Sequence, residues 1–360
     1  MPLPPALVLV VLICILQSAS LHPLRIAMNR SSQSAAIDSR VASADALRRQ
    51  GDMEGAERLL LQAIKISPES IAANDALGEL LLAKQRYSEA MQNFEVVLAR
   101  FPSDSRARAG ERQAAITLAL NERNSGRGEE ALLQLQHART YLPDDLTLLT
   151  DLGIQAQTMH QLTLAASVLN EALKIRPSDP KALYAAARVE TDQEHFASAE
   201  EHLRSYLAQR PNDASAHYGL GHLLQMQLRT DEARSEFDRS IALQPVQTES
   251  YYQIGQMSLD GGRNDEAAQM FQQTLSRMPT HGGALTGMGI LAYRSKRYVD
   301  ARDMLMQAVA AAPEYQPAHY YFGLTLARLG DKEASTRELK IAAELASEQQ
   351  GKGQPVFVRH

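Results

Sequence analysis

Histidines and neighbouring carboxylates are the residues of this 360-residue chain whose types suit acid–base or metal chemistry. His217 and His222 are five residues apart in one segment with a helical pattern, whereas side chains that share a helix face are three or four apart. Asp144 and Asp145 directly follow Pro143, a place typical of a helix N-cap. We therefore predict no catalytic or metal-binding set among these residues.

Motifs with a known catalytic mechanism do not occur in the sequence either. We find no His-Glu-x-x-His, no phosphate loop, no Gly-x-Ser-x-Gly and no cysteine pair. Basic residues number 37 against 42 acidic ones, without a basic block, which argues against a nucleic-acid surface. We expect a non-enzymatic protein with no cofactor, no metal, no small-molecule substrate and no nucleic-acid partner.

Tyrosines at a fixed interval are the best candidates for binding. Tyr184, Tyr218 and Tyr252 are 34 residues apart, and Tyr320 follows after two further intervals, with Thr286 between. We call this place in each repeat the ladder position. Tyrosine offers rigid apolar area and one hydroxyl, which suits an extended peptide or a partner helix.

The residue four places after a ladder tyrosine lies one helical turn along the same face. Together these positions predict a partner-binding face, formed by Tyr184, Arg188, Tyr218, His222, Tyr252, Gln256 and Tyr320. The alternative is that the tyrosines only pack neighbouring repeats together.

The interval of the tyrosines is the period of the chain. Prolines recur at Pro68, Pro102, Pro143, Pro177, Pro211, Pro245, Pro279 and Pro313. Six of the seven intervals are 34 residues and the second is 41. Twelve residues before a proline is always an alanine, including Ala90, Ala165, Ala199, Ala233, Ala267 and Ala301. Twelve residues further upstream is a glycine or alanine, the glycines being Gly78, Gly153, Gly221, Gly255, Gly289 and Gly323.

The spacing of these small residues and prolines predicts helix hairpins. Apolar residues such as Leu220, Leu223, Leu224 and Leu228 recur at spacings of three and four, which predicts amphipathic helices. Small residues permit two helices to cross closely, and a proline ends the second helix. Each repeat is then a hairpin that must stack on its neighbours to bury its apolar face. The seven extra residues of the third repeat should lengthen its first helix or widen the preceding turn.

The pattern resembles the tetratricopeptide repeat family. Its Leu-Gly, Ala, Phe and Pro landmarks correspond here to Leu152-Gly153, Ala165, Leu169 and Pro177, for example. The resemblance covers residues 37–347 and implies an all-α fold, a right-handed α-solenoid of about nine hairpins. The repeats are expected near 37–70, 71–104, 105–145, 146–179, 180–213, 214–247, 248–281, 282–315 and 316–347.

The resemblance also implies a function. The ladder position would face a concave groove, and the chain would be a non-catalytic protein–protein interaction scaffold for a peptide or protein partner. The alternative is a structural subunit of an envelope or secretion complex that assembles through the array edges or the long third repeat. Some family members hold a C-terminal carboxylate with Lys and Asn on three successive first helices. Here only Arg188, with Lys181 nearby, supplies positive charge, so we do not expect that clamp.

The ends of the chain carry the expectations on localisation. Residues 6–16 are an uninterrupted apolar run that contains Cys14, the single cysteine; the run is too short to span a bilayer as a helix. Residues 1–20 are expected to be a signal peptide, giving an exported, periplasmic or extracellular protein. The alternatives are an N-terminal membrane anchor or a wrongly chosen start of a cytoplasmic protein. Residues 21–36 are expected to be a polar linker and residues 348–360 a flexible tail.

Overall fold

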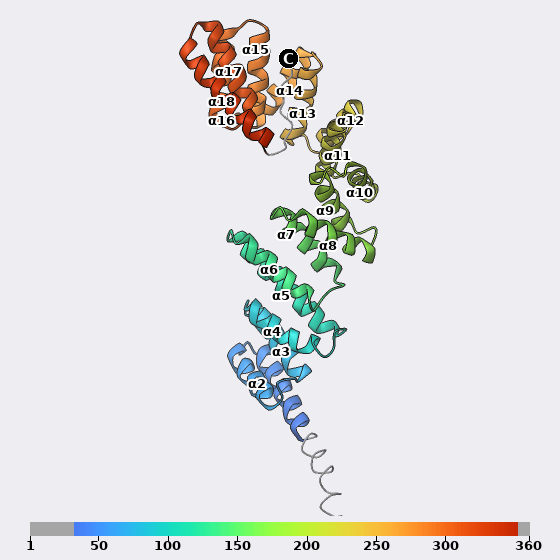
Figure 1. Ribbon diagram of the computed structural model, residues 1–360. Coiled ribbons are helices and arrows are strands. Elements are labelled where there is room, and N and C mark those ends of the chain that lie inside the picture. Colours follow the sequence, from blue (N-terminus) through green and yellow to red (C-terminus); the bar gives the residue numbers. More distant parts are fainter. Residues whose placement is uncertain (1–31, 352–360) are drawn as a thin grey trace, which may run out of the picture. The chain divides into compact units, whose positions relative to one another are not determined.

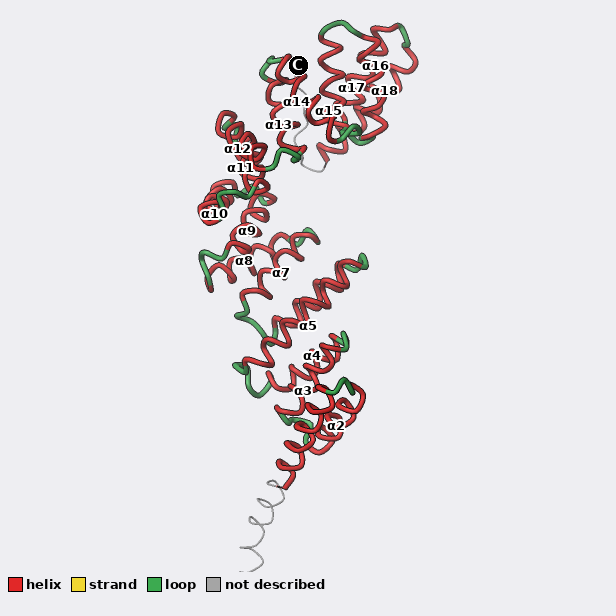
Figure 2. Tube along the Cα trace, turned by 180° about the vertical axis from the view of Figure 1, so that it is seen from behind, coloured by secondary structure: helices red, strands yellow, loops and turns green. Residues whose placement is uncertain are grey.

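The computed structural model describes residues 32–351, and all their regular secondary structure is helical (Figures 1 and 2). Helix begins at residue 32, within the range expected for the linker, and continues to Gly351, past the expected start of the tail. Helix thus extends a few residues beyond both expected ends of the array. The signal or anchor at 1–20 lies outside the described residues. Between residues 32 and 351, no helix has the length and apolar character needed to cross a bilayer.

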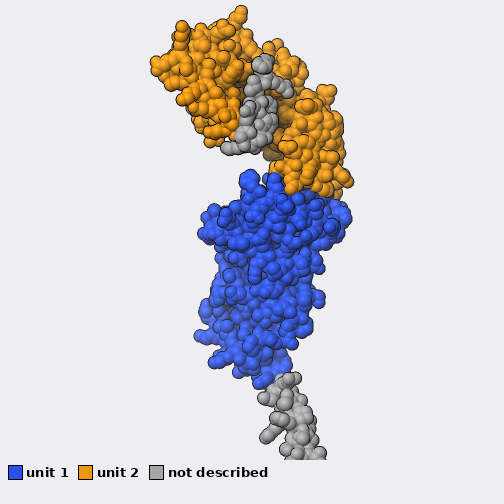
Figure 3. All heavy atoms as spheres, in the orientation of Figure 1, with its two compact units in different colours: residues 1–189 blue, residues 190–360 orange. Residues whose placement is uncertain are grey.

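The chain divides into two compact units, coloured separately in Figure 3: unit 1, Met1–Val189, and unit 2, Glu190–His360. After the helical residues 32–49, unit 1 holds α2 (Met53–Ile66), α3 (Ile71–Ala83), α4 (Tyr87–Leu98), α5 (Ser105–Asn124), α6 (Gly128–Arg139), α7 (Leu146–Thr158), α8 (Leu162–Ile175) and most of α9 (Pro180–Asp192). Unit 2 holds α10 (Phe196–Gln209), α11 (Ala214–Met226), α12 (Thr230–Leu243), α13 (Thr248–Asp260), α14 (Asn264–Arg277), α15 (Gly282–Arg294), α16 (Tyr298–Ala311), α17 (Gln316–Leu329) and α18 (Lys332–Gly351).

Each unit is a stack of helix hairpins, as the period predicted. The odd-numbered helices from α3 to α17 are the first helices of their hairpins. In unit 2, for example, α11 packs on α12 and α13 on α14, and α13 also packs on the next first helix, α15. The all-α solenoid expected from the sequence is confirmed.

The six glycines singled out for packing lie against a large side chain of the second helix. A Cβ built on any of them would come within 2.5–2.8 Å of that side chain, which is Phe94 for Gly78 and Phe237 for Gly221. The six alanines singled out on the second helices are fully buried. Small residues therefore lie at the close helix crossings, at the positions that the sequence singles out for packing.

The turn inside each hairpin contains one residue with left-handed backbone. Four of these residues are glycines: Gly51, Gly126, Gly262 and Gly330. Five are not: Gln85, His160, Glu194, Leu228 and Lys296. Leu228, with φ +61° and 79% exposure, follows the end of α11 and does not belong to its apolar face, contrary to the sequence reading. The period of 34 therefore extends to the backbone conformation of the turns.

The long third repeat lengthens its first helix. The helix α5 has 20 residues, whereas α3 and α7 have 13 each. Gly110 of α5 meets the ring of Phe94 on the preceding hairpin, and a Cβ there would lie 2.2 Å from that ring. The next residue, Glu111, is fully buried at the register of Leu77 and Leu152. The extra residues thus add helix to α5 and leave a carboxylate inside the core.

Candidate partner-binding sites

Three of the predicted binding tyrosines lie on first helices of unit 2. Tyr218 is on α11, Tyr252 on α13 and Tyr320 on α17. Tyr218 is half-buried, with its ring 5.8 Å from that of Phe237, and burial raises the pKa of its hydroxyl. Tyr320 is 42% exposed. Thr286 at the ladder position of α15 is buried, and its hydroxyl donates to the carbonyl of Gly282.

Tyr252 is held by its neighbours. Its ring centroid is 4.6 Å from that of His281 and 6.2 Å from that of Phe271. A Cβ on Gly283 would lie 2.7 Å from this ring, and the hydroxyl donates a hydrogen bond to Tyr315. Burial, together with Tyr315, raises the pKa of Tyr252. This tyrosine packs successive hairpins together, the role that the sequence left as the alternative.

In unit 2, the polar residues one helical turn after the ladder tyrosines, His222 and Gln256, are accessible to solvent at least in part. His222 on α11 is exposed to solvent, yet the surrounding protein removes part of its hydration and lowers its pKa. It is therefore mostly neutral at pH 7 and can exchange hydrogen bonds with a partner. Gln256 is half-buried, and its amide donates to Asp260 at 3.2 Å.

The remaining predicted residues belong to unit 1. Tyr184 and Arg188 are on α9, where Tyr184 is half-buried and Arg188 is exposed. The other five are in unit 2, so a continuous face through all seven stays a prediction.

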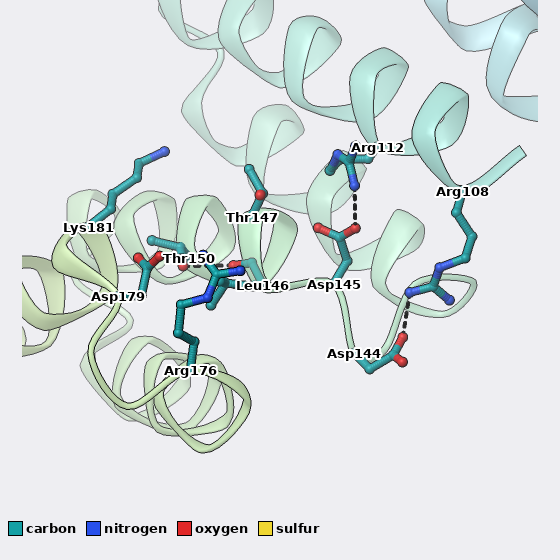
Figure 4. Close-up of a pocket in the computed structure, with 10 residues that line it drawn as sticks. All are labelled: Arg108, Arg112, Asp144, Asp145, Leu146, Thr147, Thr150, Arg176, Asp179 and Lys181. Atoms are coloured by element: carbon teal, nitrogen blue, oxygen red, sulfur yellow. Dashed lines mark hydrogen bonds and ion pairs between the residues drawn. The ribbon is translucent and has the colours of Figure 1, made fainter. Parts of the chain in front are cut away.

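A cavity of about 320 Å³ in unit 1 was not foreseen from the sequence. It lies where α5, the start of α7 and the turn before α9 meet (Figure 4). Its lining residues are mostly charged: Arg108, Arg112, Asp144, Asp145, Leu146, Thr147, Thr150, Arg176, Asp179 and Lys181. Thr150 occupies the ladder position of α7, so a short side chain stands here in the place of a tyrosine.

The two arginines of α5 are neutralised by carboxylates at the edge of the cavity. Arg108 pairs with Asp144 at 2.6 Å and Arg112 with Asp145 at 2.8 Å (Figure 4). The pairing with Arg108 lowers the pKa of Asp144. Asp145 also accepts from the backbone N–H of Leu148, so the N-cap expected from the sequence is present.

The cations at the other side of the cavity, Arg176 and Lys181, have more exposed side chains. Arg176 is 3.4 Å from Asp179, and its side chain is 63% exposed. Asp179 also accepts from the backbone N–H of Ala182 at 3.0 Å. Lys181 pairs with Asp151, and its side chain is 55% exposed. Arg176 is thus the lining cation with the most freedom to meet a ligand.

Metal binding finds no support in the part of the chain that the structure describes. Within residues 32–351, no group of three or more His, Cys, Asp or Glu side chains is arranged to hold a metal ion.

Stacked hairpins with an exposed first-helix face define a repeat protein of the α-solenoid class. The chain belongs to the tetratricopeptide repeat family: models described as "Tetratricopeptide repeat" match residues 47–116 and 258–340, and residues 150–214, 184–248 and 218–281. No curated protein matches the sequence significantly.

Solved structures of other proteins share this fold. A tetratricopeptide repeat protein from Parabacteroides merdae is 18% identical, with a TM-score of 0.55 over 67% of this chain and 95% of its own. PilF from Pseudomonas aeruginosa is 18% identical, with a TM-score of 0.53 over 61% and 99% of the two chains. MamA from Desulfovibrio magneticus RS-1 is 21% identical, with a TM-score of 0.44 over 48% and 97%. The family and its fold make this chain a protein–protein interaction scaffold.

Proposed function

We propose that the chain is a non-catalytic scaffold that holds a peptide or protein partner against the first-helix face of unit 2. This face comprises the ladder positions of α11, α13, α15 and α17 and the residues one turn along. The observation that supports the proposal best is the shared register of Tyr218 and Tyr320 with accessible surface beside them, since Tyr320 is 42% exposed and His222 is exposed. Tyrosine next to neutral hydrogen-bonding groups suits peptide recognition.

Tyr252 has a supporting role in this proposal. Since its ring and hydroxyl are engaged by His281 and Tyr315, it contributes to the shape of the face more than to direct contact. The residues expected to touch the partner are therefore Tyr218, His222 and Tyr320.

A photo-crosslinking experiment tests the proposal. Benzoylphenylalanine replaces Tyr320 on the first helix α17 or, as the control, Met306 on the second helix α16, where 53% of the side chain is exposed. We expect a specific adduct from position 320, identified by mass spectrometry and reproduced with the purified partner. Tyr218→Ala should abolish this adduct while the circular dichroism spectrum stays that of the parent.

The control position distinguishes the alternative function. An adduct from position 306 that persists in Tyr218→Ala, with none from position 320, would contradict groove binding. It would instead favour a structural subunit that assembles through the outer helices.

The proposal includes export, which rests on the apolar run at residues 6–16 and the small residues Ser18, Ala19 and Ser20 after it. The alternative is an anchor formed by the uncleaved apolar segment. Cell fractionation followed by amino-terminal sequencing tests this. A mature chain that starts near Leu21 outside the cytoplasmic membrane is expected, and an intact Met1 in the cytosol would overturn export.

A further inference from the structure

We propose that the charged cavity of unit 1 is a binding subsite for an acidic side chain, Glu or Asp, of a peptide segment. This site lies in a different unit from the tyrosine face and contains none of its residues. The group bound at this site would be a carboxylate that contacts Arg176 and Lys181 from the open side of the cavity.

Space for the ligand follows from Thr150. In α11 and α13 the same register carries Tyr218 and Tyr252, whose rings fill the room beside their helices. Thr150 is buried and its hydroxyl donates to the carbonyl of Leu146 at 2.7 Å, so it neither fills the cavity nor offers its proton to a ligand. The cavity of about 320 Å³ has room for a carboxylate side chain.

Charge selects an anion over a cation. Asp144 is paired with Arg108, and Asp145 is bound both by Arg112 and by the N–H of Leu148. Each of these two carboxylates therefore already has a basic side chain of the chain as its partner. Arg176, in contrast, holds Asp179 only at 3.4 Å and is 63% exposed. A guanidinium has five N–H donors, so Arg176 retains donors for a second carboxylate, which it can bind in bidentate geometry.

Lys181 provides a second positive charge on the same side. It lies in the first turn of α9, five residues after Arg176, and lines the same cavity. Lys181 is paired with Asp151, and its side chain is 55% exposed. Arg176 and Lys181 both line the cavity with exposed side chains, whereas Arg108 and Arg112 of α5 are paired with Asp144 and Asp145.

The chain offers a matched control for Arg176. Arg176 is the C-cap residue of α8, and Arg210 is the C-cap residue of α10 exactly one period later in the sequence. Both are exposed, and changing either to glutamine removes one positive charge. Arg210 does not line the cavity, so any difference between the two variants reports on the site and not on net charge.

The experiment titrates the full chain with a fluorescein-labelled hexaglutamate peptide and follows fluorescence anisotropy at low ionic strength. Hexaglutamine and hexalysine serve as control peptides. We expect saturable binding of hexaglutamate alone, weakened about five- to tenfold by Arg176→Gln and unchanged by Arg210→Gln. Binding should also weaken as salt is added, because the contacts are between accessible charges.

A second variant tests the cavity without changing charge. Thr150→Tyr places the ladder tyrosine in α7 and should remove hexaglutamate binding with a helical circular dichroism spectrum retained. If this variant does not fold, the pair Arg176→Gln and Arg210→Gln still decides. Equal binding by those two variants, equal binding of hexaglutamine, or no hexaglutamate binding by the parent chain would overturn the proposal.

Discussion

The two units share one fold and one period but differ in what they place at the ladder position. Unit 1 has Asp75, Ala109 and Thr150 there before Tyr184, whereas unit 2 has Tyr218, Tyr252, Thr286 and Tyr320. The first three of these positions thus hold a buried carboxylate, an alanine and a buried threonine, whereas most of the later ones hold a tyrosine. Because the backbone plan is the same, the units differ at single positions on a repeated scaffold, which is where the proposed binding residues lie.

The core of the two units also differs, at a deeper level. Unit 1 buries Asp75 at 2% exposure and Glu111 at 0%, and Asp75 Oδ1 and both carboxylate oxygens of Glu111 have no hydrogen-bond partner among the described residues. Burial raises the pKa of Asp75 to about 6 and that of Glu111 to about 8, with Glu95 adding to the second shift. The corresponding residue to Glu111 in unit 2 is an apolar Leu220. Unit 1 thus carries a pH-sensitive core.

The largest loss of folding free energy is expected at a packing position that both units share. Phe94 lies between Gly78 and Gly110, and Phe271 lies between the corresponding glycines of unit 2. We expect Phe94→Ala and Phe271→Ala each to lower the free energy of unfolding by about 3–5 kcal/mol, because both leave a cavity at a helix crossing. Urea denaturation followed by circular dichroism measures this. A loss confined to one variant would break the equivalence of the two packing arrangements.

The second prediction concerns the pH dependence of stability, which the buried carboxylates of unit 1 should cause. The pKa of Glu111 is raised from 4.5 to about 8, so the folded chain binds an extra proton between these values. The free energy of unfolding should therefore fall as pH rises from about 5 to about 8, by about 3–5 kcal/mol in total.

Two variants sharpen that prediction. Glu111→Gln should leave only the smaller pH dependence that Asp75 causes below about pH 6, and Glu111→Leu should raise stability at pH 8 above that of the parent. The nearby titratable residues Glu95, His137 and Tyr141 are unchanged in both variants. A change in pH dependence relative to the parent is therefore due to residue 111. A parent chain with the same stability at pH 5 and pH 8 would contradict the assignment.

The smallest effect divides the tyrosines of unit 2 themselves. Tyr252→Ala should cost about 2–3 kcal/mol of folding free energy, because it removes buried ring area and the hydrogen bond to Tyr315. Tyr320→Ala should cost about 0.5 kcal/mol, since the side chain is 42% exposed. Thermal melting of the two variants checks the order, and equal losses would mean that Tyr320 is also a packing residue.

The sequence predicted the hairpins, their boundaries to a few residues and the glycine contacts, because each depends on a short-range pattern repeated many times. It did not predict the cavity, which depends on α5, the α6–α7 turn and the α8–α9 turn meeting in space. One signal was present: Thr150 lies one period before Tyr184, at a ladder position without a tyrosine. Glu111 was also detectable, since it is one period after Leu77, yet the seven extra residues obscured its register. The apolar spacing predicted that Leu228 belongs to a helix, but this residue lies in the turn after α11, where the backbone is left-handed.

The lengthened helix α5 has a consequence for how such arrays tolerate insertions. A helix advances about 100° per residue, so seven residues rotate it by about 700°, only about 20° short of two full revolutions. Gly110, which meets Phe94, and the buried Ala119 are nine residues apart and so lie about 180° apart around α5. Without the seven residues their separation of two residues would be about 200°, so the relative direction of the two faces is nearly kept. An insertion of five residues would have turned one of these faces into solvent. The net rotation that an insertion causes in a helix, more than the number of added residues, therefore decides whether the stacked repeats can keep their packing.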